Sequence, residues 1–537
     1  MIKNLALFIF LGVANCIAQS CPGATCPIRF IIYIQMENRT LDEMFGTFPG
    51  VQNYCQGGHS PKRCTNSQQT DCSVIATHDV CGNGGWCEPL RCTTPSGPEC
   101  SAGDTCPQIT TYETGSGVPL VLQDSSTSYQ DTGHAQADFL KELHGGLMNG
   151  WSRTTTPGTL VYYDSTQLPY TYLLASTYGL ADNHFSSMGG PSQPNHLYMF
   201  AASSHESSDN PTLTKPGPGS PGNSGTWNSP WTCGALHYGS SVPYLYTGTL
   251  LSTRAIDGTR YFGGTCSNDR TKACVCSCPT GMKCPASTFD ASHPCSDSTN
   301  CSTVGNLCDN SFSLGGTLGA PCPTITTIAD LAEAKLGPRA WAYYSWNAIW
   351  NAALQSQQIY FNATRLNTHV HHDSQFNIDV ASCTASSCSL PPIIFLSPDL
   401  VSNSEHPPAP IINGESWLKA KLTPYFSNPY VYAHSVVFIT WDDWGGKYDH
   451  VPPPVKDSVP TLGFRVPLLC LGPYCRNRIT HTQMEFASVL KCMESVFGLP
   501  NINSRDANAT DACSGTGTLT KNQNGMVNLS QSPIPPL

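Results

Sequence analysis

The sequence predicts an α/β protein built on an open, mostly parallel β-sheet with helices on both faces. Apolar runs typical of buried strands occur at residues 28–35, 435–440 and 466–471, and segments with helical periodicity lie between them. The 537 residues include 46 glycines and 43 prolines, which indicates a loop-rich globular protein and not a helical bundle or a coiled coil.

The three apolar runs have the composition of strands that are covered on both faces. Residues 28–35 read IRFIIYIQ, residues 435–440 read SVVFIT and residues 466–471 read VPLLCL. Strands between two layers of helices are almost continuously apolar, whereas half-exposed strands alternate apolar and polar residues. We therefore assign these runs to buried strands.

The clearest helix is expected at residues 485–498. Apolar residues recur three or four positions apart from Phe486 to Phe497, so that they share one face, and Gly498 can end the helix. Residues 170–179 and 328–336 show weaker helical patterns. Because strands and helices alternate, the parallel sheet is favoured, and ligands of such sheets bind beyond the carboxyl ends of the strands.

The amino terminus predicts export. Residues 1–20 combine a basic start at Lys3, an apolar stretch at residues 5–14 and small residues at 18–20, which is the pattern of a secretory signal peptide. No later run approaches the 18 or so apolar residues of a membrane-spanning helix. We expect a secreted protein, extracellular or periplasmic, with no transmembrane segment in the mature chain.

Cysteine usage points to the same compartment. One of the 27 cysteines lies in the signal peptide, and the remaining 26 could form up to thirteen disulfides in an oxidising environment. Eight fall between Cys55 and Cys106 and nine between Cys266 and Cys322. We interpret these stretches, at about 52–107 and 262–323, as disulfide-stapled insertions in a single domain, 21–537. Metal-binding thiols at residues 274–278 are the alternative for part of the second stretch.

The charge balance excludes one class of partner. Charged residues make up 12% of the chain, about half of the usual ~25%, and the formal net charge is −10. A nucleic-acid-binding protein carries a basic patch, so no nucleic-acid binding is expected.

Polar clusters follow two of the predicted strands. Glu37 and Asn38 come directly after the first strand, and Asp442 and Asp443 follow residues 435–440. Oxygen ligands at adjacent strand ends can converge on one divalent cation, which would also relieve the repulsion between two aspartates. The alternative is a solvated acidic turn.

Residues 189–196, GGPSQPNH, place Ser192 at the expected amino end of a helix. The helix dipole and the free N–H groups there favour an anion such as phosphate. Serine is also a preferred N-cap residue, so a purely structural role is the alternative.

Four histidines are further candidates, namely His134, His371, His372 and His406. Beside a nucleophile and a metal, they could stabilise negative charge or donate a proton to a leaving group. A histidine in a polar loop is more often only a surface residue.

Taken together, the motifs resemble a known family. Residues 32–50, IYIQMENRTLDEMFGTFPG, the segment GGPSQPNHLYMFA and the run ITWDDWGGKYDHVPPP are similar, in this order, to motifs of the bacterial phosphoesterase family that contains non-toxin phospholipases C and secreted acid phosphatases. The resemblance implies an alkaline-phosphatase-like three-layer α/β/α sandwich and a metal-dependent site that hydrolyses phosphate esters.

The resemblance also implies roles for particular residues. Five would hold one divalent metal ion of unknown identity: Glu37, Asn38, Ser192, Asp442 and Asp443. Ser192 would also be the nucleophile, with His134, His371, His372 and His406 around the phosphate and with Asn195 and His450 in substrate binding. Family phospholipases usually have threonine at the position of Ser192, Asp-Glu at that of Asp442-Asp443 and Asn-Arg at that of Asn195-His196.

These departures leave the substrate open between a phospholipid and a phosphomonoester. Two other functions are kept as alternatives. The chain could be a catalytically inactive, cysteine-rich surface binding protein on the same scaffold, or it could hydrolyse sulfate esters or phosphonates.

Overall fold

The structure is a computed structural model. It describes residues 27–51, 109–110, 117–118, 121–143, 151, 158–205, 207, 209–213, 233, 240–243, 318–319, 322–346, 348–399, 402–454, 462–513, 525–529 and 531–537. The predicted signal peptide, the insertion at 52–107, most of the insertion at 262–323 and the thiols at 274–278 lie outside the described residues.

The centre of the fold is an eight-stranded sheet with the strand order β12-β11-β13-β1-β14-β15-β6-β16. Its strands are β1 (Phe30–Met36), β6 (Gly179–Ala181), β11 (Trp341–Ser345), β12 (Val370–His372), β13 (Ile393–Ser397), β14 (Ser435–Trp441), β15 (Leu468–Leu471) and β16 (Arg478–Thr480). The three predicted strands correspond to β1, β14 and β15.

The sheet is mostly parallel, as predicted. β1 runs parallel to both of its neighbours, and Ile34 pairs with Leu396 of β13 and with Ile439 of β14. β15 is the exception, because it runs antiparallel to β14 and to β6. Every residue of β1 and β14 is buried, which explains their unbroken apolar sequences.

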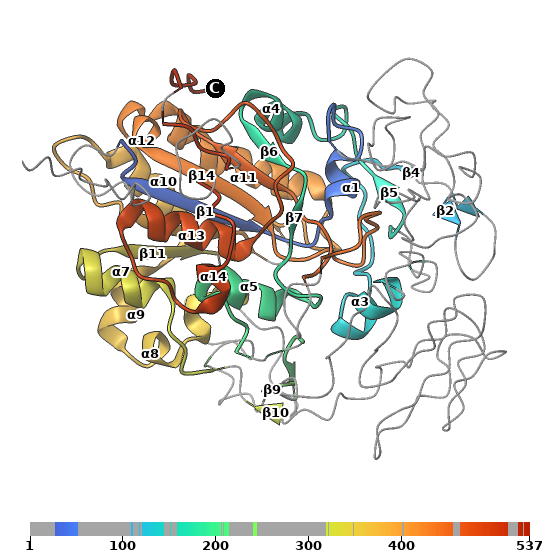
Figure 1. Ribbon diagram of the computed structural model, residues 1–537, viewed down its shortest axis with the longest axis horizontal. Coiled ribbons are helices and arrows are strands. Elements are labelled where there is room, and N and C mark those ends of the chain that lie inside the picture. The colour runs from blue at the N-terminus through green and yellow to red at the C-terminus, as the bar shows by residue number, and fades with distance from the viewer. Residues whose placement is uncertain are drawn as a thin grey trace, which may run out of the picture.

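Helices cover both faces of the sheet (Figure 1). On one face lie α4 (Pro169–Thr177), α10 (Asp373–Ser382), α11 (Ile411–Ser427) and α12 (Pro429–Ala433). On the other face lie α5 (Ser192–Ala201), α7 (Ile328–Leu336), α13 (Phe486–Phe497) and α14 (Ser504–Ala507). This arrangement is an α/β sandwich.

The predicted helices begin and end at residues with the expected capping signals. α7 begins with a capping box between Thr327 and Asp330, and α13 begins with one between Glu485 and Ser488. α13 ends at Gly498, whose φ of 65° belongs to the left-handed region that glycine adopts without strain. α4 has proline in its first turn and ends before β6, so the predicted helix at 170–179 is confirmed up to its last two residues.

The smaller elements complete the described chain. The helical ones are α1 (Leu41–Phe45), α3 (Gln136–Leu143), η3 (Ala352–Gln355), α8 (Gln357–Tyr360) and α9 (Ala363–His369). The strands are β2 (Ile109–Thr110), β3 (Gly117–Val118), β4 (Val121–Leu122), β5 (Val161–Tyr162), β7 (His184–Phe185), β8 (Thr212–Leu213), β9 (Ser240–Pro243), β10 (Leu318–Gly319) and β17 (Met484–Glu485).

Four disulfides link described cysteines in pairs, namely Cys233–Cys322, Cys383–Cys388, Cys470–Cys475 and Cys492–Cys513. The prediction of a disulfide-bonded chain is thus confirmed for these pairs.

Within the described part of the chain, we find no helix with both the length and the apolar character needed to cross a bilayer.

Candidate active site

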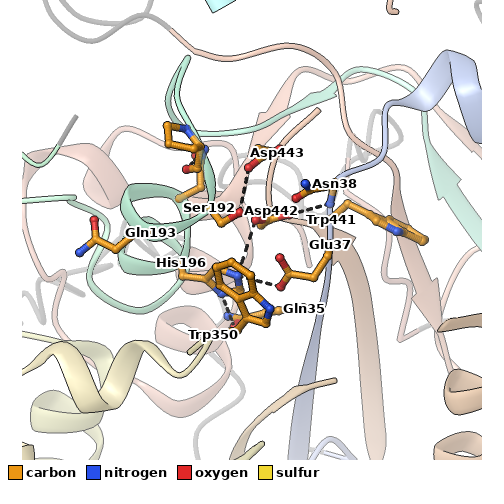
Figure 2. Close-up of polar contacts among 12 residues, drawn as sticks. Gln35, Glu37, Asn38, Ser192, Gln193, His196, Trp350, Trp441, Asp442 and Asp443 are labelled. Atoms are coloured by element: carbon orange, nitrogen blue, oxygen red, sulfur yellow. Dashed lines mark hydrogen bonds and ion pairs between the residues drawn. The ribbon is translucent and has the colours of Figure 1, made fainter. Parts of the chain in front are cut away.

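The two acidic motifs meet because their strands are neighbours. β1 and β14 are parallel and in register, so that Met36 pairs with Trp441. Glu37 and Asp442 therefore follow the same point of the sheet edge, where the Asp442 N–H still donates to the Met36 carbonyl at 3.1 Å. Segments that are about four hundred residues apart in sequence thus present their carboxylates side by side (Figure 2).

Asn38 turns the chain at this edge and is buried. Its φ is 59°, in the left-handed region that asparagine tolerates better than most residues. Its backbone N–H donates to Asp442 Oδ1 at 2.8 Å, which fixes the two motifs to each other. Gly445 packs so closely that a Cβ there would lie 2.6 Å from Asn38 Cβ, so the turn after Asp443 requires glycine.

Ser192 is the first residue of α5 and is fully buried. Its hydroxyl donates to Asp443 Oδ2 at 3.1 Å, across 251 residues of sequence. The N-cap position of α5 is occupied by Pro191, so Ser192, which follows it, is not the N-cap residue of this helix. The hydroxyl is instead directed into the carboxylate cluster (Figure 2).

Asn195 supports the segment that carries Ser192. Its Oδ1 accepts from the Met188 N–H at 3.1 Å, and its Nδ2 donates to the Gly190 carbonyl at 2.7 Å and the Pro191 carbonyl at 3.1 Å. The amide thus holds the turn before α5 in shape. Backbone groups thus occupy both ends of the amide, and the role of Asn195 in substrate binding stays a prediction.

The carboxylates repel one another strongly. Burial raises the pKa of Glu37 well above its usual range, and the charges of Asp442 and Asp443 raise it further. Burial also raises the pKa of Asp443, with Asp442 adding to the effect. Each group would be easier to ionise if a positive charge lay among them.

The same residues offer ligand atoms for such a charge. Glu37 Oε2, Asn38 Oδ1 and Asp442 Oδ2 are buried, and none has a hydrogen-bond partner among the described residues. Buried oxygen atoms normally have partners, so three unpartnered ones in one cluster are informative. The donor set of carboxylate and amide oxygens suits a hard or borderline divalent cation.

His196 also belongs to this cluster, although in the sequence it stands out only as a departure from the family pattern. It follows Ser192 by one helical turn and is fully buried. Its Nε2 lies 3.0 Å from Glu37 Oε1 and 3.7 Å from Asp442 Oδ2. Burial lowers the pKa of His196 to about 4, although the charge of Asp442 opposes this. The i, i+4 spacing from Ser192 was the signal that could have identified it.

His134 and His406 lie beside each other, with ring centroids 6.1 Å apart. Each has its Nδ1 2.6 Å from a backbone carbonyl, of Thr132 for His134 and of Pro407 for His406. A ring that donates through Nδ1 leaves Nε2 as its chemically active nitrogen. The Nε2 of His134 lies 3.5 Å from Asn38 Nδ2.

The electrostatic surroundings of these two histidines differ. Burial alone would lower the pKa of His134, but the charges of Asp443 and Asp131 outweigh it and raise the pKa to about 9. Burial lowers the pKa of His406, against an opposing effect of Asp131.

His371 and His372 are not brought to the cluster. They lie on β12, the edge strand, which is separated from β1 by β13 and β11. At 4.7–4.9 Å between strands, this places them roughly 14 Å to the side. His371 Nε2 lies 3.0 Å from the Thr368 carbonyl, and His372, half exposed, lies 3.1 Å from Asp373. Their predicted place around the phosphate is not supported by this geometry.

His450 is held in a separate buried ion network. Its Nδ1 lies 2.6 Å from Asp42 Oδ2, and Arg465 contacts both Asp42 and Asp449, at 2.7 and 2.9 Å. The network fixes the loop after β14 to α1. His450 therefore contributes to the frame of the site, and its role in substrate binding stays a prediction.

Comparisons with known proteins identify the family. A model of the "Phosphoesterase family" matches residues 28–500. Phospholipase C B of Mycobacterium tuberculosis is 23% identical over 534 residues, which cover 93% of this chain and 79% of that protein. Non-specific phospholipase C1 of Arabidopsis thaliana is 28% identical over 140 residues, which cover 21% of this chain and 25% of that protein.

Similarity to solved structures is weaker. The crystal structure of Ps i-CgsB with k-i-k-neocarrahexaose covers 73% of this chain and 75% of that chain, with a TM-score of 0.29 and 10% identity, and supports no inference. The family match, in contrast, includes both strand-end motifs and the Ser192 segment. The chain therefore belongs to the phosphoesterase family, and it is a hydrolase of phosphoric esters.

Proposed function

We propose that this chain is an exported, metal-dependent phosphoesterase of the phospholipase C type that uses Ser192 as its nucleophile. The observation that carries the proposal is the hydrogen bond from Ser192 to Asp443 within a cluster of buried carboxylates. An isolated buried cluster of this kind is costly, so it indicates a bound cation beside the hydroxyl.

Glu37, Asn38, Asp442 and Asp443 would hold one divalent cation, with Ser192 as a further ligand. When bound, this ion would lower the pKa of the Ser192 hydroxyl and neutralise charge on the phosphate. The unpartnered oxygens of Glu37, Asn38 and Asp442 support this ligand set.

In the proposed reaction, Ser192 Oγ attacks phosphorus while the bond to the leaving oxygen breaks. The hydroxyl proton departs along the hydrogen bond toward Asp443. The amino end of α5 and the imidazoles of His134 and His406 favour the negative charge on the phosphoryl oxygens. One of these histidines, acting through Nε2, protonates the leaving oxygen. Water then attacks phosphorus and gives a proton to the histidine that protonated the leaving oxygen, while the serine oxygen leaves and takes back the proton from Asp443.

The choice of a phospholipid substrate rests on the relatives. The long match is to a phospholipase C, and the plant relative has the same type of name. Ser192 and the pair Asp442-Asp443 depart from the usual phospholipase residues toward those of the acid phosphatases, so a phosphomonoester is the second candidate substrate.

We also place the sandwich in the alkaline-phosphatase-like superfamily.

Export is supported by the four disulfides between described cysteines, because such bonds persist in oxidising compartments. The pattern of residues 1–20 supports it independently.

The test is hydrolysis by the Ser192→Ala variant, assayed on phosphatidylcholine, a simple phosphomonoester and an aryl sulfate. A matched control is Ser435→Ala, which removes a buried hydroxyl at the opposite end of β14 that contacts Tyr425 at 3.2 Å. We expect Ser192→Ala to lose phosphate ester hydrolysis by about 10³-fold or more, while the control retains it.

The outcomes separate the alternatives. Equal activity of wild type and Ser192→Ala would refute the nucleophile. Hydrolysis of the sulfate alone would favour the sulfatase alternative. Failure of pure, metal-loaded wild type on all three substrates would favour the inactive binding protein.

A further inference from the structure

One tryptophan contacts two histidines of the site. The indole of Trp350 is stacked on the imidazole of His196, with centroids 5.4 Å apart and planes inclined by 14°. The same indole is stacked on His406, at 5.7 Å and 26°. Figure 2 shows Trp350 against His196, beside Glu37 and Gln35. Aromatic pairs of this geometry contribute energy and orientation beyond the area they bury.

The chain holds Trp350 firmly in place. It follows the carboxyl end of β11 and is 1% exposed. Tyr343 of β11 donates its hydroxyl to the Trp350 carbonyl at 2.8 Å. The next residue, Asn351, donates to Ser345 Oγ at 3.0 Å and accepts from the Ala353 N–H at 3.0 Å. The indole is therefore part of a rigid support that extends from the sheet.

His196 requires such a support. Its two ring nitrogens face the oxygens of Gln35 and Glu37 at 3.3 and 3.0 Å. A rotation of the ring would break both contacts and would free the Glu37 carboxylate to turn. Groups that orient a ligand carboxylate in this way strengthen metal binding although they do not touch the metal.

His406 has fewer polar restraints. Its Nδ1 bonds to the carbonyl of the residue that follows it, Pro407, so this contact moves with the histidine itself. Its ring contacts are with His134 and Trp350. The indole is thus a fixed surface from another part of the chain against which this imidazole is placed.

We propose that Trp350 is a positioning residue that sets both His196, beside the cation ligands, and His406, beside the phosphate. The inference rests on the proposed function and extends it. It assigns one side chain to the alignment of two groups that serve different parts of the reaction.

The test compares Trp350→Phe, Trp350→Leu and Trp350→Met with wild type. The dissociation constant of Mn²⁺ is measured by calorimetry on the metal-free protein, and kcat is measured at saturating Mn²⁺. We expect the Leu and Met variants to bind Mn²⁺ about 10-fold more weakly, and Phe, which keeps an aromatic face, to remain within about 3-fold of wild type. Two aliphatic variants are used so that one remains if the other does not fold.

The matched control is Trp341→Leu. Trp341, the first residue of β11, is buried like Trp350 and is likewise stacked on a histidine, His369, at 4.3 Å and 10°. This pair lies away from the carboxylate cluster, so the variant should lose thermal stability but keep its Mn²⁺ affinity.

Two further variants separate the two contacts. His196→Gln already removes the contact between Trp350 and His196. Adding Trp350→Leu to this variant should therefore weaken Mn²⁺ binding by no more than about 2-fold. At saturating Mn²⁺, Trp350→Leu should still have kcat about 10-fold below wild type through His406, and adding Trp350→Leu to His196→Gln should lower kcat by about the same factor relative to His196→Gln alone.

Unchanged Mn²⁺ affinity in both aliphatic variants, or equal losses in the Phe and Leu variants, would overturn the inference. Failure of the proposed function gives a different result. In that case Mn²⁺ would not bind to wild type, or its binding would not depend on Glu37.

Discussion

Replacement of Glu37 by glutamine should change the stability of the protein in opposite directions without and with a cation. Glu37 is fully buried, and its ligand oxygen lies within 4.8 Å of one on Asp442. Glutamine has nearly the same shape but no charge. Without a cation the substitution removes a repulsion, and with a cation it removes a ligand.

The size of the first effect follows from the distance. Two unit charges within 4.8 Å of each other repel by at least about 3.5 kcal/mol at an effective dielectric constant of 20. Burial and the neighbouring aspartates raise the pKa of Glu37, so proton uptake relieves part of this repulsion. We therefore expect metal-free Glu37→Gln to be more stable than metal-free wild type by about 1–3 kcal/mol, most clearly at mildly alkaline pH.

The second effect is measured in the same assay, urea unfolding with chelator or with added Mn²⁺. A ligand at 100 times its dissociation constant stabilises the folded state by about 2.7 kcal/mol. Wild type should gain about this much from Mn²⁺, and Glu37→Gln should gain less than about 1 kcal/mol at the same concentration.

A matched control is Glu485→Gln. Glu485 is also a buried carboxylate, but it is paired with Arg505 at 2.7 Å. The same substitution there breaks an attraction and should destabilise the protein equally with and without Mn²⁺. If Glu37→Gln behaves like this control, the carboxylates do not form a cation site and our reasoning is refuted.

Three other predictions follow from single sites. Gly445→Ala should destabilise the protein by at least about 1–2 kcal/mol, because alanine is strained at the left-handed φ of 57°. It should also reduce activity, because the new Cβ would displace Asn38; unfolding and kinetics on the same preparation check both effects. Arg465→Met should destabilise the protein by about 3–5 kcal/mol, since it removes the buried guanidinium that contacts both Asp42 and Asp449; a loss below about 1 kcal/mol in urea unfolding would contradict this. Burial and Asp506 raise the pKa of Glu494 from 4.5 to about 9. The protonated carboxyl therefore stabilises the folded state at low pH, and this stability is lost as pH rises from about 4.5 to about 9. Glu494→Gln should make the free energy of unfolding depend less on pH across this range.

The sequence predicted the sheet best where strands are long and buried on both faces. β1 and β14 are such strands, and every residue in them is buried. Because the two strands are neighbours, the polar residues directly after them meet, as the resemblance to the family implied for Glu37, Asn38, Asp442 and Asp443.

Other strands carry a weaker signal. β11, with the sequence WAYYS, and β13, with IIFLS, have five residues each, and such short apolar runs do not distinguish strand from helix. α11 was not predicted, and it contains Pro424, which normally interrupts a helical pattern.

The histidines show the limit of a motif. His371 and His372 are part of β12, and the position of β12 at the sheet edge depends on strand order, which the sequence does not state. Trp350 and His196 were missed for the converse reason. Their importance lies in a contact between side chains that are 154 positions apart in sequence.

Phosphopeptide mapping tests the nucleophile most directly. The protein is mixed with a phosphate ester substrate and Mn²⁺, quenched in acid within the first turnover and digested for mass spectrometry. Our account predicts a phosphoryl group on the peptide that contains Ser192. Turnover with no phosphoserine, together with inversion of configuration at a chiral phosphorus, would show direct attack by water and would contradict it.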